Sequence, residues 1–214
     1  RQLGIVPSTC LHIMRELVTA HLVAFEPNGK VYRLGLEILG LASELSLHDA
    51  FIQSAQPRLA QFAHDFGVSA SAQQRDGDEV VVVAAVVAAE GLASPVGRRF
   101  PCFSAAAGRL YASAATWSDA ERHAHFERVR WQNRPDFDDW MAEVRLARTR
   151  GYAIDEGQFR LGVTSIAAGI ADSQGEILRT ISINVVSAQM EGKRRASFVR
   201  ALERMAGEIA SAFR

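Results

Sequence analysis

The segment GIVPSTCLHIMRELVTAHLVAFEPNGKVYRLGLEILG, residues 4–40, decides how the first part of this chain folds. Near its start, apolar residues recur at the i, i+3, i+4, i+7 and i+8 spacing of an amphipathic helix: Cys10, Ile13, Met14, Leu17 and Val18. We expect Ser8 to cap this helix, with Pro7 beside it. The sequence therefore predicts a short helix with one apolar and one polar face.

A small hairpin is predicted directly after this helix. Residues 22–26 and 30–34 are short strand candidates around Asn28-Gly29, a pair typical of hairpin turns. A helix followed at once by an antiparallel wing is typical of a winged helix-turn-helix, which docks in the major groove of DNA. A plain solvated face is the alternative for the polar side of the helix. The turn at Gly4 and the hairpin favour DNA binding.

The chain begins at Arg1 without a methionine and partway into this motif, so we expect the winged helix-turn-helix to have its front truncated. Residues 1–40 carry four basic and three acidic side chains, a balance of +1. This is a weak electrostatic footprint for a DNA-binding domain. A symmetric dimer would double it.

A leucine-rich stretch follows the hairpin. Its apolar residues are Leu36, Ile38, Leu39, Leu41, Leu45 and Leu47. This apolar density exceeds what a lone surface helix needs. A linker helix that packs on a partner subunit would account for it.

The remainder of the chain alternates helices and strands irregularly. Helices are expected at 49–66, 104–115, 118–128, 136–150 and 191–214. Strands are expected at 68–74, 79–87, 164–172 and 176–186. The first helix should re-initiate at Pro57 and end at Gly67, and the Val- and Ala-rich strand at 79–87 should be buried on both faces. This order predicts an α+β domain with a mixed, mostly antiparallel sheet.

Composition sets the class of protein. The 214 residues are 48% hydrophobic and 22% charged, with zero formal net charge, which is ordinary for a globular protein. No apolar run approaches the ~20 residues that cross a bilayer, and no signal peptide opens the chain, so no membrane partner is expected. Two cysteines provide no disulfide framework, and a cytoplasmic location is expected.

Several motifs together resemble the IclR family of bacterial transcriptional regulators. In the first part, the matching pieces are Ser8-Thr9, Glu16-Leu17-Val18, Asn28-Gly29 and Tyr32-Arg33-Leu34-Gly35. In the second part, they are Val96-Gly97-Arg98-Arg99-Phe100-Pro101, Ala107-Gly108-Arg109, Arg150-Gly151-Tyr152-Ala153-Ile154-Asp155-Glu156, Gly162-Val163 and Ile166-Ala167-Ala168. Their order and spacing across essentially the whole chain carry the identification.

The resemblance implies three segments: a partial winged helix-turn-helix at 1–35, a linker helix at 36–48 and a GAF-like effector-binding domain at 49–214. It also implies double-stranded operator DNA, a small organic or aromatic acid as effector, and a homo-oligomer, either dimer or tetramer. By this resemblance, we expect the given sequence to lack the first helix and most of the second helix of the winged domain. Leu11 and His12 stand where the family more often has His and Arg, so base preferences cannot be carried over.

Six residues are candidates for DNA contact. Ser8 and Thr9 suit phosphate or base edges, and His12 and Arg15 suit the groove. Lys30 and Arg33 lie on the wing, where they would add sequence-independent charge. A role in wing packing is an equal alternative for Arg33. His21 is better explained as a helix-end residue than as a base reader.

The resemblance also points to effector-binding positions: Ala89, Leu92, Ala106, Ala107, Asp155, Ser165, Ser182 and Asn184. Ser182 and Asn184 lie two apart on a predicted strand, so their side chains leave the same face. Ala106 and Ala107 lie at a helix start, which suits an anion. The alternative is that Ser182 and Asn184 are exposed strand residues, with Ile181, Ile183 and Val185 toward the core. Asn184 departs from the family, in which a smaller hydroxyl residue is commoner.

Catalytic and metal-binding functions find little support. His123 and His125 are two apart on a predicted helix and do not share a face, and no metal or nucleotide motif occurs. No nucleophile elbow is present, and Cys102 fits a buried packing residue better than a reactive thiol. We expect no cofactor, no metal and no enzyme activity.

Two functions remain. The first is a transcriptional regulator whose operator binding is modulated by a small metabolite in the second domain. The second is a stand-alone small-molecule-binding module that acts through protein contacts, which the zero net charge would suit.

Overall fold

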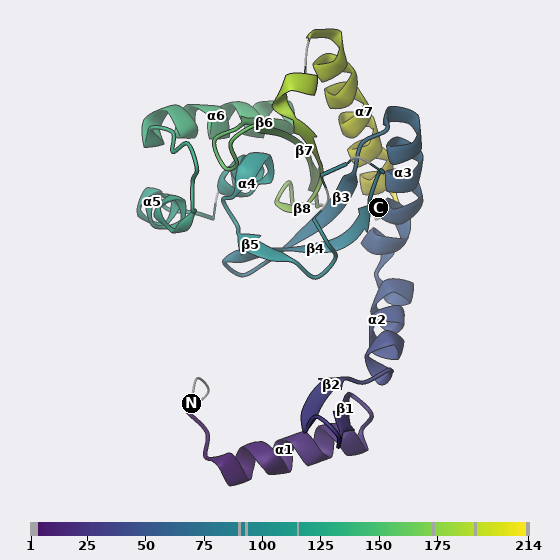
Figure 1. The fold of residues 1–214 in the computed structure, drawn as a ribbon. Coiled ribbons are helices and arrows are strands. Elements are labelled where there is room, and N and C mark those ends of the chain that lie inside the picture. The colour runs from purple at the N-terminus through teal and green to yellow at the C-terminus, as the bar shows by residue number, and fades with distance from the viewer. Residues whose placement is uncertain are drawn as a thin grey trace. The chain divides into compact units, whose positions relative to one another are not determined.

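The computed structural model describes residues 4–89, 91–92, 94–114, 116–172, 174–190 and 192–212. The chain divides into two compact units, Arg1–Asp49 and Ala50–Arg214. The first unit contains α1 (Pro7–Thr19), β1 (Val23–Glu26), β2 (Val31–Leu34) and α2 (Glu37–His48) (Figure 1). Within the described ranges, no helix has both the length and the apolar character that crossing a bilayer requires.

Helix α1 begins at a proline. Its N-cap is Val6, which has extended backbone angles and no side-chain capping hydrogen bond, and Pro7 takes the first helical position. A proline fits there because its missing N–H would have no partner inside the helix and its fixed φ already suits the helix. The prediction that Ser8 caps the helix is therefore wrong, because Ser8 already lies within the first turn.

The end of α1 explains why a glycine closes the Tyr-Arg-Leu-Gly motif. His21 has a left-handed φ of 55°, and the N–H groups of His21 and Leu22 donate to the carbonyls of Val18 and Leu17, which forms a Schellman motif. A Cβ atom on Gly35 would lie 1.9 Å from the carbonyl oxygen of His21. The second strand of the hairpin can therefore approach the helix end only if residue 35 has no side chain. His21 is a helix-end residue, as predicted.

The predicted hairpin is confirmed, with a longer turn than its sequence suggested. Strands β1 and β2 pair antiparallel, with Glu26 opposite Val31. The connecting loop is therefore the four residues Pro27 to Lys30, and Lys30 has the left-handed φ of 49°. Asn28-Gly29 lies inside this loop and does not form a two-residue turn by itself.

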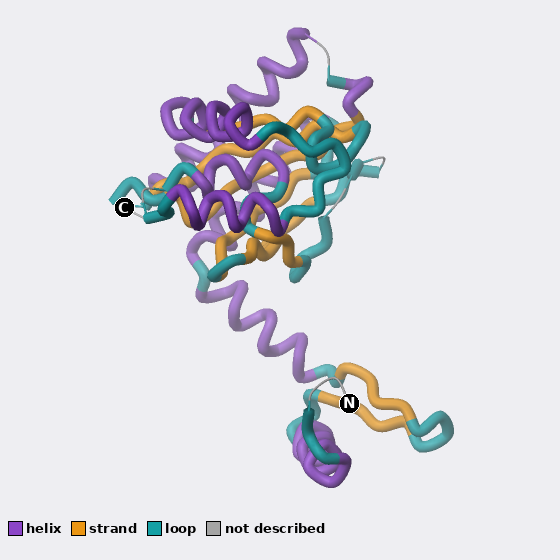
Figure 2. The backbone as a smooth tube through the Cα atoms, turned by 90° about the vertical axis from the view of Figure 1, so that its left-hand side faces the viewer, coloured by secondary structure: helices purple, strands orange, loops and turns teal. Residues whose placement is uncertain are grey.

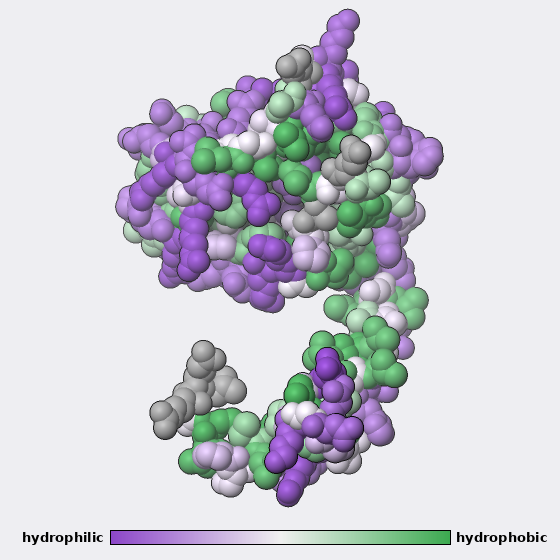
Figure 3. Space-filling view, viewed as in Figure 1, coloured by the Kyte–Doolittle hydropathy of each residue, from purple (hydrophilic) through white to green (hydrophobic). Residues whose placement is uncertain are grey.

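Helix α2 exposes most of its leucines. In Figure 3 the hydrophobic colour covers much of this helix. The exposed leucines in and beside it are Leu36, Leu39, Leu41, Leu45 and Leu47. No residue of α1 or α2 is buried in the described part of the first unit. These apolar surfaces are therefore available to other elements or to another chain.

The second unit is built on a six-stranded sheet with the order β5-β4-β3-β8-β7-β6. The strands are β3 (Ala70–Asp76), β4 (Glu79–Val86), β5 (Arg99–Pro101), β6 (Tyr152–Glu156), β7 (Val163–Ala171) and β8 (Ile177–Val186). Every neighbouring pair is antiparallel, so the expectation of a mixed sheet is wrong, whereas the α+β class is confirmed. Strands β5 and β6 were not predicted.

Helices cover both faces of this sheet (Figures 1 and 2). On one face lie α3 (Ala50–Phe66) and α7 (Gly192–Ser211), which contact each other and the sheet. On the other face α4 (Ala105–Ala112) contacts β6, β7 and β8, and α6 (Phe137–Arg150) packs on α4 and β6. Helix α5 (Asp119–Arg128) contributes Phe126 to the core on this second side.

The alternation of residues along β8 divides the two cores. Ile181, Ile183 and Val185 are buried in the core beneath α3 and α7, as expected. The predicted stripe of α7 lies in the same core: Phe198, Leu202, Met205 and Ile209. The intervening residues of β8 face the opposite side of the sheet, where α4 lies.

Helix α3 runs without interruption through Pro57, so the predicted re-initiation there is wrong. The helix stops before Gly67, as predicted, and Gly67 has a left-handed φ of 65°.

Strand β4 contributes to both cores. Val80 is buried on the side of α4, whereas Ala84 is buried beneath α3 and α7. The facing changes because the register of β4 against β3 shifts between Val82 and Ala84, which leaves Val83 as an extra residue. The strand therefore has buried residues on both faces, as predicted, although the residues between them are half-buried.

Candidate functional site

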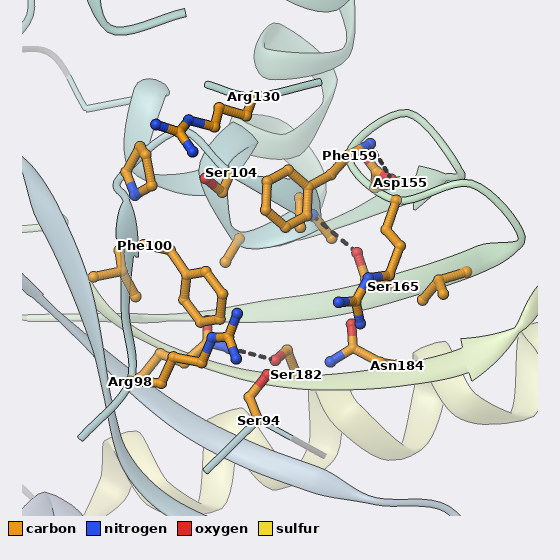
Figure 4. A pocket seen from close by; sticks show the side chains of 18 of the residues that line it. Ser94, Arg98, Phe100, Ser104, Arg130, Asp155, Phe159, Ser165, Ser182 and Asn184 are labelled. Carbon is orange, nitrogen blue, oxygen red and sulfur yellow. Dashed lines mark hydrogen bonds between the residues drawn. The ribbon is translucent and has the colours of Figure 1, made fainter. Parts of the chain in front are cut away.

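A cavity of about 630 Å³ opens on the face of the sheet that carries α4 (Figure 4). This volume is in the ordinary range for a small-molecule site. The loop before β5, the start of α4, the ends of β6, β7 and β8, and the loop from β6 to β7 all line it. Seven of the eight predicted effector positions line this cavity: Leu92, Ala106, Ala107, Asp155, Ser165, Ser182 and Asn184. Ala89 lies in an exposed turn, outside these lining residues.

Polar residues of two neighbouring strands form the floor. Ser165 on β7 lies directly opposite Asn184 on β8. Ser182 is buried, and its hydroxyl accepts a hydrogen bond of 2.8 Å from the side-chain amide of Gln73 and lies 3.2 Å from the hydroxyl of Ser71. Ser182 is therefore not an exposed strand residue, whereas Asn184 is half-buried.

The start of α4 forms one wall of the cavity, and hydrogen-bonding groups lie there. The N–H of Ala106 donates to the hydroxyl of Ser165 at 3.0 Å, which ties the helix to the floor. The Ser104 hydroxyl is buried and has no hydrogen-bond partner among the described residues. Ala105 has a left-handed φ of 54°, which is rare for a residue with a side chain and is often found at binding sites. An unpaired hydroxyl beside the start of a helix suits an anionic group.

A buried charge network lies behind this wall. The Arg109 guanidinium, almost fully buried, donates to the carbonyl oxygen of Ala105 at 3.0 Å and to the Asp155 carboxylate at 3.2 Å. It also contacts Glu143 and Gln158. The other carboxylate oxygen of Asp155 accepts hydrogen bonds from the N–H groups of Gln158 and of Phe159. Both oxygens of Asp155 are therefore engaged within the protein.

This network explains two of the sequence motifs. In Ala107-Gly108-Arg109, a Cβ atom on Gly108 would lie 2.1 Å from the backbone of Phe103, so only glycine fits, and Arg109 reaches Asp155. Sequence reasoning placed Asp155 at the cavity and did not assign Arg109 a role. The presence of Arg109 in a motif that matches the family was the signal that could have pointed to a role for it.

Arginines form much of the remaining lining. They are Arg98, Arg99, Arg128, Arg130 and Arg160. Two aromatic rings, Phe100 and Phe159, also line the cavity and meet edge-to-face, with their centroids 6.3 Å apart. Sequence reasoning did not identify these arginines as a group, because they come from separate segments without shared spacing.

Cys102 and His125 pack beside the cavity without a visible chemical role. The Cys102 sulfur lies 3.8 Å from Nδ1 of His125, and burial raises the pKa of the thiol to about 11. Burial lowers the pKa of His125, whose ring contacts the rings of Phe103 and Trp117. Cys102 is therefore a protonated, buried packing residue, as predicted, because a thiolate is the reactive form. The described residues contain no cluster of three His, Cys, Asp or Glu side chains that suits a metal.

The six candidate DNA contacts all lie exposed in the first unit. Ser8, His12 and Arg15 follow one another at i, i+4 and i+7 along α1, so they share a helix face, with Thr9 beside them. Lys30 lies at the tip of the hairpin. The Arg33 guanidinium lies 2.5 Å from the Glu26 carboxylate, so its charge is already paired across the two strands.

Comparison with known proteins identifies the class. The family described as bacterial transcriptional regulator IclR C-terminal matches residues 45–211. This chain belongs to the IclR family of transcriptional regulators.

Two curated relatives are also named as regulators. The chain is 22% identical over 187 residues to an uncharacterized HTH-type transcriptional regulator of Haemophilus influenzae, which covers 83% of this chain and 70% of the relative. It is 24% identical over 183 residues to the Pca regulon regulatory protein of Pseudomonas putida, which covers 82% of this chain and 60% of that protein. Both are named as regulators and neither as an enzyme. The chain thus spans less than two thirds of the Pseudomonas protein.

Solved structures share the fold. The crystal structure of an IclR transcriptional regulator from Alicyclobacillus acidocaldarius matches with a TM-score of 0.88 at 22% identity, covering 99% of this chain and 87% of that one. The Thermotoga maritima IclR structure matches with a TM-score of 0.77 at 18% identity, covering 98% and 87% of the two chains.

Proposed function

We propose that this regulator binds operator DNA through α1 and its hairpin, and that a small organic acid bound in the cavity modulates this binding. The observation that carries the proposal is the buried hydroxyl of Ser104 at the start of α4, which has no hydrogen-bond partner among the described residues and lies beside a polar floor. A buried polar group without a partner costs free energy, and a ligand that accepts its hydrogen bond removes that cost.

The chemistry of the cavity favours an acid. The first turn of α4 presents amide groups that have no acceptor within the helix, and its dipole favours negative charge there. Ser165, Ser182 and Asn184 offer hydroxyl and amide groups from the floor, with Ser104 at the wall. Phe100 and Phe159 supply apolar contact for a carbon skeleton or an aromatic ring.

Asp155 takes a different role from that of a ligand contact. Its two oxygens bind Arg109 and the backbone of residues 158–159, and a second carboxylate would be repelled by its charge. We assign Asp155 to the positioning of the loop that carries Phe159.

DNA recognition would use the exposed face of α1. Ser8 and Thr9 are placed for phosphate, and His12 and Arg15 for base edges. In a dimer, two such recognition helices bind the two half-sites of an operator. The exposed leucines of α2 are suited to pack against a second copy, so we propose a homodimer or homotetramer in the bacterial cytoplasm.

A thermal-shift screen of aromatic and short carboxylic acids tests the cavity. A ligand at 100 times its dissociation constant should stabilise the protein by about 2.7 kcal/mol. Replacing Ser165 or Ser182 with alanine should reduce the shift, whereas the matched replacement Ser46→Ala, outside the cavity, should not. An equal ligand response in all three variants would contradict the cavity assignment.

The alternative is a small-molecule-binding module that acts through protein contacts, which the zero net charge favours. A gel-shift titration with the DNA upstream of the protein's own gene, at low salt, separates the two functions. A salt-dependent shift of the DNA band supports operator binding by a transcriptional regulator. The absence of a shift with and without acids supports the alternative.

A further inference from the structure

The charges around the cavity are strongly unbalanced. Asp155 is the single acidic residue among the described residues of the lining, and it is paired with Arg109 at 3.2 Å. Five arginines share the same lining. The cavity therefore carries an excess of positive charge that its own acidic residue does not offset.

Two of these arginines have carboxylate partners outside the cavity. Arg99 pairs with Asp76 and Glu79, and Arg128 pairs with Asp78 at 2.7 Å. These two guanidinium groups already have their charge neutralised.

The other three have no such partner. Arg98, Arg130 and Arg160 form no ion pair within the described ranges of the chain. The Arg98 guanidinium rests on the ring of Phe100, 5.2 Å from its centroid, a contact that leaves its charge uncompensated. Three positive charges thus remain for a ligand.

These arginines enter from three segments. Arg98 precedes β5, Arg130 follows α5, and Arg160 lies in the loop from β6 to β7. In Figure 4, Arg98 and Arg130 lie on opposite sides of the view, with the rings of Phe100 and Phe159 between them. They are exposed, so they surround the mouth of the cavity, whereas Ser104 is buried within it.

We propose that the effector carries two separate anionic groups, and that it is a dicarboxylate. One carboxylate binds at the start of α4, where Ser104 and the helix amides lie, and the second is held at the mouth by Arg98, Arg130 and Arg160. The phenylalanine rings contact the carbon chain between them. This inference rests on the proposed function, because it names the chemical class of the acid that the cavity takes.

The physical reason is charge pairing. A single carboxylate at the α4 start would leave the three mouth arginines unpaired, whereas a second carboxylate can accept paired hydrogen bonds from a planar guanidinium. Because the mouth is open to solvent, this second interaction should weaken as salt is added. The interaction of the second carboxylate with these arginines should therefore contribute more to selectivity between acids than to the affinity for any one acid.

Calorimetric titration of the whole chain tests the proposal. The probes are the straight-chain dicarboxylates from malonate to suberate, the monocarboxylates pentanoate and hexanoate, and the pair terephthalate and benzoate. Inorganic phosphate, which carries its charges on one group, is the comparison for a single doubly charged anion. We expect at least one diacid to bind about tenfold more tightly than the monoacid of equal chain length.

The arginine variants locate the second group. Arg130→Gln and Arg160→Gln should each weaken diacid binding several-fold, and the triple replacement with Arg98→Gln should abolish the preference for diacids, while monoacid binding changes less than about twofold. Arg148→Gln, an exposed arginine of α6 outside the cavity, is the matched control and should change neither.

The outcomes are distinct. Monoacids or phosphate that bind as tightly as every diacid would overturn the dicarboxylate inference and leave the proposed function in place. A triple variant that keeps the diacid preference would also overturn it. If none of the acids binds, both the inference and the assignment of the cavity to an acid fail.

Discussion

At the scale of single residues, the buried pair of Arg109 and Asp155 connects the cavity wall to the loop from β6 to β7, which also lines the cavity. The guanidinium fixes the carbonyl of Ala105 at the start of α4, and the carboxylate fixes the N–H groups that lead into Phe159. Removal of Asp155 leaves the buried Arg109 guanidinium with Glu143 as its remaining carboxylate partner and leaves the N–H groups of Gln158 and Phe159 without this acceptor. Such a loss is more costly than that of an exposed pair.

Asp155→Ala should therefore lower the free energy of unfolding by about 3 kcal/mol, measured by urea denaturation. The neighbouring replacement Glu156→Gln breaks only an exposed pair with Arg195 and should cost less than about 0.5 kcal/mol. The resemblance placed Asp155 among the effector-binding positions, a role in which its loss would weaken ligand binding and leave the fold intact. Equal stability of the two variants would restore that expectation.

Gly108 and Gly207 form a matched pair of helical glycines. A Cβ atom on Gly108 would overlap the backbone of Phe103, whereas one on Gly207 would meet nothing within 4 Å. We predict that Gly108→Ala destabilises the protein by about 2–4 kcal/mol, and that Gly207→Ala stabilises it by about 0.5–1 kcal/mol. Thermal and urea unfolding of both variants measure the difference, and a stable Gly108→Ala protein would contradict the close approach.

His125 gives a pH dependence with a definite sign. Burial lowers its pKa in the folded state, against opposing attraction from Asp78, so the unfolded chain takes up a proton at a higher pH than the folded one. Its contribution to stability is present above about pH 6.5 and is lost as pH falls below that value. His125→Gln should flatten the decline in unfolding free energy between pH 7 and 5, and the exposed His48→Gln should not. A decline unchanged in His125→Gln would rule this out.

At the scale of elements, periodicity predicted most of the fold. The apolar stripes of α1 and α7 and the strands β3, β4, β7 and β8 were all visible in the sequence. The prediction missed β5 and β6 because three and five residues are too few to show a period-2 pattern. Strand β5 pairs with β4 across the long loop that joins them, and β6 pairs with β7 across the loop that follows it. These pairings leave no local pattern in the sequence.

The site was predictable only in part, for a related reason. The floor residues follow from a period of two on one strand, and the resemblance supplied their role. The mouth arginines converge from three segments between residues 98 and 160, so only the folded chain brings them together. The sequence pattern also does not show which charged side chains pair, and the ion pair between Glu26 and Arg33 is one example.

The hairpin yields a prediction at this scale. Lys30 is exposed and unpaired within the described residues, whereas Arg33 is already paired with Glu26. If the hairpin contacts DNA phosphates, Lys30→Ala should lower the salt dependence of operator binding by about one unit of slope, and Arg33→Ala should change it less. Fluorescence anisotropy at several salt concentrations measures both slopes. A larger effect of Arg33→Ala would exclude the structural role of that arginine.

At the scale of the whole molecule, we propose that an acid bound in the cavity of the second unit alters DNA binding by the first. An acid can alter operator affinity only if it binds differently to the free and the DNA-bound states, and the coupling is reciprocal. Typical couplings of about 1–3 kcal/mol change affinity by roughly 5- to 150-fold. The operator should therefore change the affinity for the acid by the same factor.

The coupling between acid and operator is measured as the operator affinity of the protein, followed by fluorescence anisotropy, with and without a saturating acid identified by calorimetry. We predict a change of at least about fivefold in the dissociation constant of the DNA, and a much smaller change in the Ser165→Ala variant. An operator affinity that stays the same while the acid fills the cavity would contradict the proposed control of DNA binding by the acid.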